Sequence, residues 1–135
     1  MGYTILMKKL VKEVANMLNR EELLKVLAVF KHAKGGQESL LDRAKKHLLE
    51  DPLVFKYEPT LSFINGRVYG SCKCPYHQNT SKICKHMVAK LIYLHKEMLE
   101  EEPEWRDFMR EYKKALQREL DSKITGEIPQ EFAYF

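Results

Sequence analysis

Three cysteines and one histidine lie within a short stretch of this 135-residue chain, in the order Cys72, Cys74, Cys84 and His86. Three thiolates and one imidazole make a complete tetrahedral ligand set of the kind that holds a structural zinc ion. Three cysteines cannot all pair as disulfides, and disulfides do not persist in a reducing cytosol. This stretch therefore favours a metal site, and we expect Zn²⁺ as the cofactor.

The spacing of these four residues constrains the backbone around them. Residues two apart on an extended strand face the same side, so Cys72 and Cys74 can reach one ion. Residues two apart in a helix point about 200° apart, because each residue turns the helix by about 100°. Cys84 and His86 therefore cannot both ligate from inside one helix. We expect a helix that begins near Cys84, with Cys84 in the incoming loop and His86 in the first turn.

The flanking sequence predicts a hairpin before these residues and a helix after them. Asn65-Gly66 is a strong signal for a two-residue hairpin turn, and residues 61–64 and 67–71 on either side are rich in strand-forming side chains. Residues 53–57 (LVFKY) have the same composition and indicate a further strand. After the histidine, one helical face predicts a single helix that Pro103 breaks. That face comprises Val88, Leu91, Ile92, His95 and Leu99.

The first fifty residues are predicted to be helical. Apolar side chains recur at helical spacing over residues 6–30, and Asn19 and Glu22 have the spacing of a capping box, which places a break near Asn19. Gly35-Gly36 ends this helical hairpin, and a third short helix stops at Asp51-Pro52. The apolar face of that third helix comprises Leu40 or Leu41, Ala44 and Leu48.

The end of the chain predicts one more helix, followed by an extended tail over residues 124–135. The apolar side chains of that helix are Trp105, Phe108, Met109, Tyr112, Leu116 and Leu120. We therefore expect an α+β fold that is mostly helical, with a small antiparallel β-hairpin and a zinc-stapled strand-to-helix finger. The expected segments are an N-terminal helical part (1–50), the finger with its hairpin, metal loop and helix (51–100), and the C-terminal helix with its tail (101–135).

The net charge of +4 is unevenly distributed. Residues 59–96 contain six basic side chains and no acidic one, whereas residues 97–135 contain six basic and eleven acidic ones. Three thiolates and one zinc ion add a net charge of −1, which leaves the finger at about +5. Such a surface is typical of proteins that contact phosphate backbones. The six basic residues are Arg67, Lys73, Lys82, Lys85, Lys90 and Lys96.

The motif and its context resemble the SWIM zinc finger family. Residues 72–76 (CKCPY) are similar to the first half of that family's CxC…CxH pattern, and Cys84-Lys85-His86 with Ala89 is similar to its CKHxxA second half. The likeness covers roughly residues 53–99, and the flanking helical segments lie outside it. His77 is a departure, because it stands where the family usually has a large aromatic side chain.

The resemblance implies a function in nucleic-acid transactions. SWIM fingers occur in transposase-like proteins, chromatin remodellers and recombination accessory proteins, where they are implicated in DNA binding or protein interaction. A short chain without a catalytic domain resembles the recombination accessory group most. This implication rests on analogy between families and not on the residues themselves.

Other interpretations of the cysteines stay open. They are buried core thiols, a redox or catalytic CxC pair, an iron–sulfur cluster, and a zinc site that uses His77 in place of His86. The remaining histidines lie in helical patterns without a neighbouring ligand, and we expect them to be surface or packed residues. They are His32, His47 and His95.

We expect a small zinc-finger protein that binds nucleic acid, with DNA favoured, through the basic side chains of the finger. The proposed contacts are Arg67, Lys73, Lys82, Lys85 and Lys90. Four protein ligands leave no open coordination position, and no phosphate loop, nucleophile elbow or paired-carboxylate motif is visible, so we expect no enzymatic activity.

The alternative is an adaptor in a DNA-transaction complex, in which the zinc only holds the local fold. The apolar residues of the helical segments would then form a homodimer or dock a protein partner. They are Leu23, Leu27, Phe30, Trp105, Phe108 and Tyr112. No apolar run of about 18 residues exists and the N-terminus does not resemble a secretion signal, so we expect a cytoplasmic location and no membrane partner.

Overall fold

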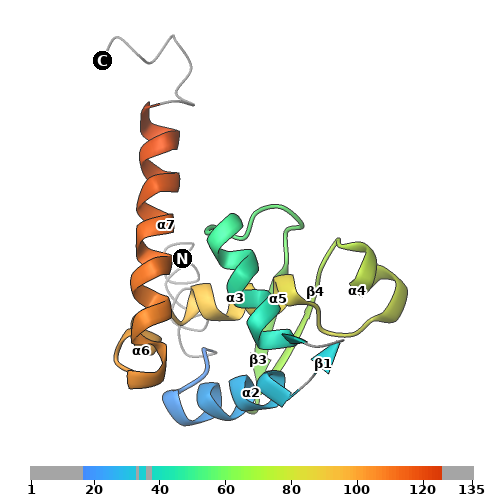
Figure 1. Ribbon diagram of the computed structural model, residues 1–135. Coiled ribbons are helices and arrows are strands. Elements are labelled where there is room, and N and C mark those ends of the chain that lie inside the picture. Colours follow the sequence, from blue (N-terminus) through green and yellow to red (C-terminus); the bar gives the residue numbers. More distant parts are fainter. Residues whose placement is uncertain (1–16, 33, 36–37, 126–135) are drawn as a thin grey trace, which may run out of the picture.

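The computed structural model describes residues 17–32, 34–35 and 38–125 (Figure 1). This part of the chain is mostly helical with two short antiparallel strand pairs, which confirms the predicted α+β class. None of its helices combines the length and the apolar character that a bilayer crossing requires.

Helix α2 (Arg20–His32) begins at the predicted capping box. Oδ1 of Asn19 accepts the N–H of Glu22 at 2.8 Å, and Oε1 of Glu22 accepts the N–H of Asn19 at 3.0 Å. Two N–H groups that the helix itself leaves unpaired are thereby satisfied. The predicted helical residues before Met17 lie outside the described part of the chain.

Strands β1 (Lys34–Gly35) and β2 (Glu38–Ser39) form a two-residue antiparallel pair that the sequence analysis missed. Helix α3 (Leu40–Glu50) follows directly, because Oγ of Ser39 accepts the N–H of Asp42 at 3.1 Å and caps the helix. The helix ends at Asp51, as predicted, and its expected apolar face is buried.

Residues 53–57 do not form the predicted strand. The carboxylate of Asp51 accepts the N–H groups of Phe55 and Lys56 at 3.3 and 3.0 Å, so these groups are not available to a neighbouring strand. Val54 adopts a positive φ of 53°, which breaks the extended backbone. The strand prediction was wrong because these local bonds outweigh a weak preference for strand.

The hairpin formed by β3 (Thr60–Ile64) and β4 (Arg67–Ser71) confirms the prediction from Asn65-Gly66. Ile64 pairs with Arg67 across a two-residue loop, and the φ values of 51° and 75° at Asn65 and Gly66 are those that a type I′ turn requires. A Cβ added to Gly66 would lie 2.6 Å from Oε2 of Glu22, so the hairpin tip lies against the start of α2.

Helix α4 (Pro75–Thr80) fills much of the loop between the two cysteine pairs and was not predicted. Helix α5 (Lys85–Leu94) has Cys84 as its N-cap, which confirms the expected start. The chain then breaks at His95 and continues as α6 (Lys96–Glu100), so the prediction of a single helix was wrong. All five residues of the predicted face are nevertheless buried.

The break at His95 has a local cause. Its Nδ1 donates to the carbonyl oxygen of Leu91 at 2.9 Å, while its backbone N–H is shared between the carbonyl oxygens of Leu91 and Ile92, each at 3.2 Å. The ring nitrogen thus competes for an acceptor that the helix uses. Nε2 of the same ring accepts the N–H of Leu18 at 3.2 Å, which ties the start of α2 to this break.

A 3₁₀ turn, η1 (Pro103–Trp105), precedes helix α7 (Arg106–Thr125). Trp105 therefore lies just before the last helix and not in it. Residues 124 and 125 belong to α7, which contradicts the predicted start of the tail, and residues 126–135 lie outside the described part.

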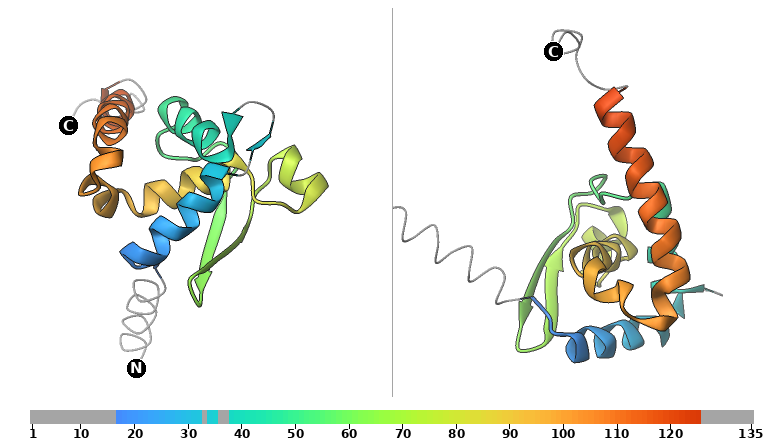
Figure 2. Two further views of the ribbon diagram at one scale, coloured as in Figure 1. Left: turned by 60° about the horizontal axis from the view of Figure 1, so that its bottom comes forward. Right: turned by 90° about the vertical axis from the view of Figure 1, so that its left-hand side faces the viewer.

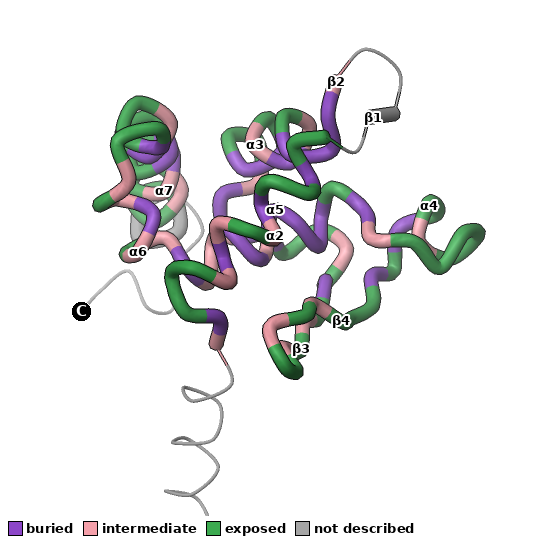
Figure 3. Tube along the Cα trace, turned by 90° about the horizontal axis from the view of Figure 1, so that it is seen from below, coloured by how far each residue is buried: buried purple, intermediate pink, exposed green. Residues whose placement is uncertain are grey.

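Helix α5 lies at the centre of the molecule. Seen end-on in Figure 2, it is flanked by the hairpin, α2 and α7, and it packs along α3. Figure 3 shows the buried residues concentrated along this helix. One hydrophobic core contains residues from α2, α3, α5, α6, η1 and α7. Because its neighbours cover it, α5 presents few side chains to solvent.

Candidate metal centre

The fold brings Cys72, Cys74, Cys84 and His86 together. All four are buried, and their ligand atoms lie within 4.8 Å of one another. Ligand atoms around a tetrahedral zinc ion with bonds of about 2.3 Å lie about 3.8 Å apart. The cluster could therefore hold a metal ion after a small contraction. It is the only such group of cysteine, histidine or acidic residues in the described part of the chain.

The backbone around the cluster positions the thiols as the spacing predicts. Cys72 and Cys74 continue the alternation of β4 beyond its end, with Lys73 exposed between them. The N–H of Lys73 donates to the carbonyl oxygen of Tyr57 at 3.1 Å, and Nε2 of Gln78 donates to that of Cys72 at 3.2 Å. These bonds fix the segment that delivers the first two thiols.

The other two ligand candidates come from the start of α5. Cys84 precedes the helix and His86 is its second residue. Cys74 stands in the same position before α4, where its Sγ accepts the N–H of His77 at 3.5 Å. Two short helices therefore begin at ligand residues.

The thiols differ in how readily they ionise in the metal-free chain. Burial raises the pKa of Cys72 and raises that of Cys84 to about 12. Burial acts in the same direction on Cys74, but hydrogen bonding to its sulfur, led by the N–H of His77, holds its pKa below the usual value. Metal binding must therefore displace protons from Cys72 and Cys84, which makes it dependent on pH.

His86 is poised as a neutral ligand. Burial, with help from the neighbouring His47 and Lys85, lowers its pKa to about 4, so the imidazole is uncharged near neutral pH. Its Nδ1 is buried without a hydrogen-bond partner, which costs about 1–3 kcal/mol unless another group satisfies it. Metal ligation through this nitrogen would remove that cost. The rings of His47 and Tyr57 pack against it, each 4.6 Å away between ring centroids.

His77, the alternative ligand, lies outside the cluster. Its Nδ1 donates to the carbonyl oxygen of Lys82 at 2.9 Å and so closes the loop after α4. Of the other histidines, His47 and His95 are packed and His32 is exposed.

The basic residues predicted to bind nucleic acid lie mainly in two regions, the hairpin tip and the surroundings of the metal cluster. Arg67 stands at the hairpin tip, five residues or on the order of 16 Å along the strand from Cys72. Lys73, Lys82 and Lys85 surround the metal cluster and are exposed.

Two of the predicted contact residues are engaged elsewhere. Lys73 forms an ion pair with Glu58 at 2.5 Å. Lys90 is half-buried, with its Nζ 5.1 Å from the centre of the Tyr93 ring. In the described part of the chain, Arg67, Lys82 and Lys85 form no ion pair.

The sequence analysis missed the contribution of α3 to this site. Leu40, Arg43 and His47 form one stripe of the helix at spacings of three and four residues, and this stripe faces the start of α5. A polar residue at helical spacing from buried leucines is a signal that could have identified Arg43 and His47.

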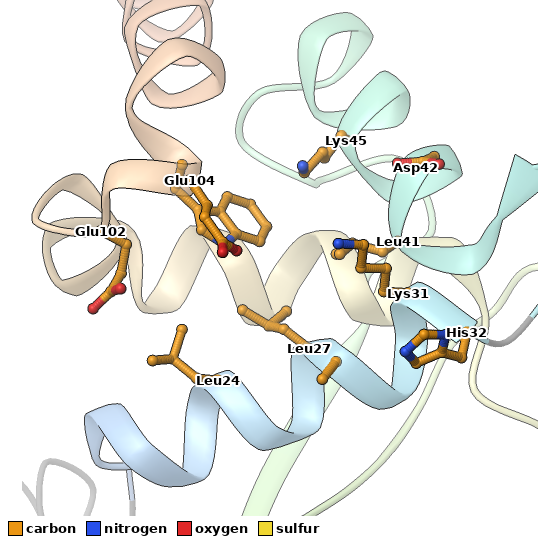
Figure 4. Close-up of a pocket in the computed structure, with 11 residues that line it drawn as sticks. Leu24, Leu27, Lys31, His32, Leu41, Asp42, Lys45, Glu102 and Glu104 are labelled. Atoms are coloured by element: carbon orange, nitrogen blue, oxygen red, sulfur yellow. The ribbon is translucent and has the colours of Figure 1, made fainter.

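A larger groove of about 670 Å³ lies on the opposite side of α3, between α2 and η1 (Figure 4). Glu102 and Glu104 lie at one end of it, and Lys31, His32 and Asp42 lie at the other. Between them, Nζ of Lys45 lies 4.3 Å above the ring of Trp105. The apolar part of the wall comprises Leu24, Leu27, Ala28, Leu41 and Trp105.

The apolar residues that motivate the adaptor hypothesis are mostly used inside the molecule. Leu23, Leu27, Phe30, Trp105 and Tyr112 are buried in the common core, and Phe108 packs against it. The groove therefore exposes only part of the apolar surface that the sequence suggested.

Comparison with protein-family models, with curated proteins and with solved structures finds no match for this chain.

Proposed function

We propose that the chain is a SWIM-type zinc module whose metal is structural. The convergence of three buried thiols and one neutral imidazole carries this proposal, because that donor set suits Zn²⁺ and fills its four positions. Cys72, Cys74, Cys84 and His86 hold the ion. With no open position, the zinc fixes the start of α4 and of α5 and activates no water.

The module binds nucleic acid, with DNA favoured, through its basic side chains. Three of the predicted contacts, Arg67, Lys82 and Lys85, are exposed and lack an acidic partner in the described residues. They remain available for phosphate groups, and each phosphate contact releases counterions from the nucleic acid. Lys73 and Lys90 contribute less, because the first is paired with Glu58 and the second is half-buried.

A salt-series titration of a labelled oligonucleotide with the metal-loaded full chain tests this function. The informative variant is Arg67→Glu with Lys82→Glu, which reverses two charges that lie outside the metal cluster. Arg118→Glu on α7 is the matched control, since Arg118 is also exposed and forms no ion pair in the described part of the chain. We expect the double variant to weaken binding and to flatten the dependence of affinity on salt. Unchanged affinity and salt slope would refute nucleic-acid binding through this surface.

The groove favours a second candidate function, a protein-interaction module in a DNA-transaction complex. Its apolar floor, with charged side chains along the rim, suits a peptide segment or a second copy of the chain. Leu24→Glu would place a charge on that floor. For a homodimer, sedimentation should show a concentration-dependent larger species that this variant abolishes. A monomer at all concentrations would count against self-association.

A further inference from the structure

A small pocket of about 120 Å³ opens beside the candidate metal centre, where α3 meets the start of α5. No acidic side chain lines it. Its wall combines two cationic side chains with two of the four cluster residues, Cys84 and His86. The lining residues are Leu40, Arg43, Tyr76, Cys84, Lys85 and His86.

Arg43 is the unusual member of this wall. Its Nε is buried and has no hydrogen-bond partner among the described residues. A guanidinium stays charged at all ordinary pH values, so it cannot relieve burial by losing a proton. A buried N–H without an acceptor lowers stability, and it does so more strongly when the group is charged. Arg43 thus lines the pocket and carries a donor, its Nε–H, that lacks an acceptor among the described residues.

The electrostatics of the pocket favour an anion. Lys85 adds a second positive charge without a carboxylate partner in the described part of the chain, and the first turn of α5 contains no acidic residue. The start of α5, which is the positive end of its helix dipole, also lies at the pocket and favours a negative ligand there. A zinc ion with three thiolates has a net charge of −1, so Arg43 and Lys85 together leave the pocket positive.

We propose that this pocket binds one phosphate group of a nucleic-acid strand, with Arg43 and Lys85 as its ligands. The inference rests on the proposed nucleic-acid function and adds a contact from α3, outside the expected finger. The volume is several times that of a water molecule, which leaves room for a tetrahedral phosphate. Tyr76, which is half exposed at the rim, can contact the adjoining sugar or base.

The direct test is NMR of the arginine Nε–H groups in the metal-loaded full chain. We expect the Nε–H resonance of Arg43 to shift when a short oligonucleotide is added, and that of Arg118, on distant α7, to stay in place. Inorganic phosphate alone is the second probe. It distinguishes a site for free phosphate from a site that binds a phosphate only as part of a nucleic-acid strand. This measurement needs no variant and is therefore independent of folding defects.

The variant Arg43→Gln gives a second readout, with Arg118→Gln as the matched control. We expect an affinity loss of about tenfold and a salt slope lower by about 0.7–0.9, the value of one phosphate contact. Metal content must equal that of the parent chain. If Arg43→Gln does not fold, Arg43→Lys keeps the charge but removes the guanidinium N–H groups, and it should also weaken binding.

The possible failures are distinguishable. If the oligonucleotide binds and depends on Arg67 and Lys82, but neither the Arg43 resonance nor Arg43→Gln responds, the pocket proposal is overturned and the proposed function stands. If inorganic phosphate shifts the Arg43 resonance but no oligonucleotide binds, the pocket is a site for free phosphate, and both the strand contact and the proposed function are wrong.

Discussion

The two ends of the molecule are held together in different ways. Around the metal cluster, the buried set is small, and α4 contains no buried residue at all. It comprises Cys72, Cys74, Cys84 and Met87. Around α7, by contrast, Trp105, Met109 and Tyr112 join a continuous apolar core, and the hydroxyl of Tyr112 donates to the carbonyl oxygen of Pro52 at 2.6 Å.

This difference indicates that metal binding stabilises one end of the molecule and that hydrophobic burial stabilises the other. A helix without buried side chains gains nothing from the hydrophobic effect, so α4 depends on the residues that begin it and close its loop. We expect the α7 end, with its continuous apolar core, to persist without a metal. Helix α5 belongs to both ends, because its first turn carries His86 and its middle carries Val88, Leu91 and Ile92.

Loss of the metal should destabilise the protein more than any of the other changes considered below. Chelation of the metal, or Cys74→Ser, should unfold residues 72–86, since metal binding and folding are coupled at about 10–16 kcal/mol in small zinc modules. Hydrogen exchange should then show lost protection in this segment and retained protection in α7. Ser71→Ala, next to the ligands but exposed, is the control. Protection of residues 72–86 that survives chelation would show that this segment does not depend on the metal for its fold.

Met109→Ala tests the apolar end. Met109 is 2% exposed, so its truncation should cost about 2–5 kcal/mol in the free energy of unfolding, measured with denaturant. The folded variant should still bind metal with the stoichiometry of the parent chain. Arg110→Ala, at an exposed neighbouring position, should cost little. If Met109→Ala stays folded but loses its metal, the stability of the α7 end and metal binding are coupled, and the two ends are not independent.

The buried His95 predicts a dependence on pH that is separate from the metal. Burial lowers its pKa below the usual value of about 6.5, and both ring nitrogens are used by the neutral form. The unfolded chain therefore binds more protons between these two pKa values, so stability falls as pH drops below about 6.5. NMR titration of the ring should show His95 still neutral where a histidine peptide is already protonated. A His95 pKa at or above that of the peptide would overturn this assignment.

The smallest effect is expected at the start of α2. Asn19→Ala removes the acceptor for the N–H of Glu22 and should cost about 1 kcal/mol in stability. Metal affinity and the metal-dependent hydrogen-exchange protection of residues 72–86 should not change, because the cap is far from the cluster in sequence and shares no hydrogen bond with it in the described part of the chain. Thermal unfolding of the metal-loaded protein measures the loss. Lys25→Ala on the exposed face of α2 is the control, and equal losses in both variants would argue against a capping role.

The features that local chemistry determines were predictable from sequence. The type I′ turn at Asn65-Gly66, the capping box at Asn19 and the start of α5 at Cys84 each follow from a few residues whose geometry has one low-energy solution. The convergence of the four ligand candidates follows from the same argument about strand and helix spacing.

The features that depend on competing bonds or on distant segments were not predictable in this way. Residues 53–57 have strand-forming side chains, but Asp51 takes their N–H groups. His95 fits a helical face, but its ring bonds the carbonyl oxygen of Leu91. Arg43 reaches the site only because α3 packs along α5, a contact between segments forty residues apart that no local pattern contains.

We claim that three thiols and one imidazole hold a structural zinc ion. X-ray absorption at the zinc edge, on protein purified without chelator, measures this ligand set. We predict one zinc per chain with three sulfur neighbours at about 2.3 Å and one nitrogen at about 2.0 Å. An absent zinc edge in folded protein, or a shell of oxygen and nitrogen without sulfur, would contradict the claim.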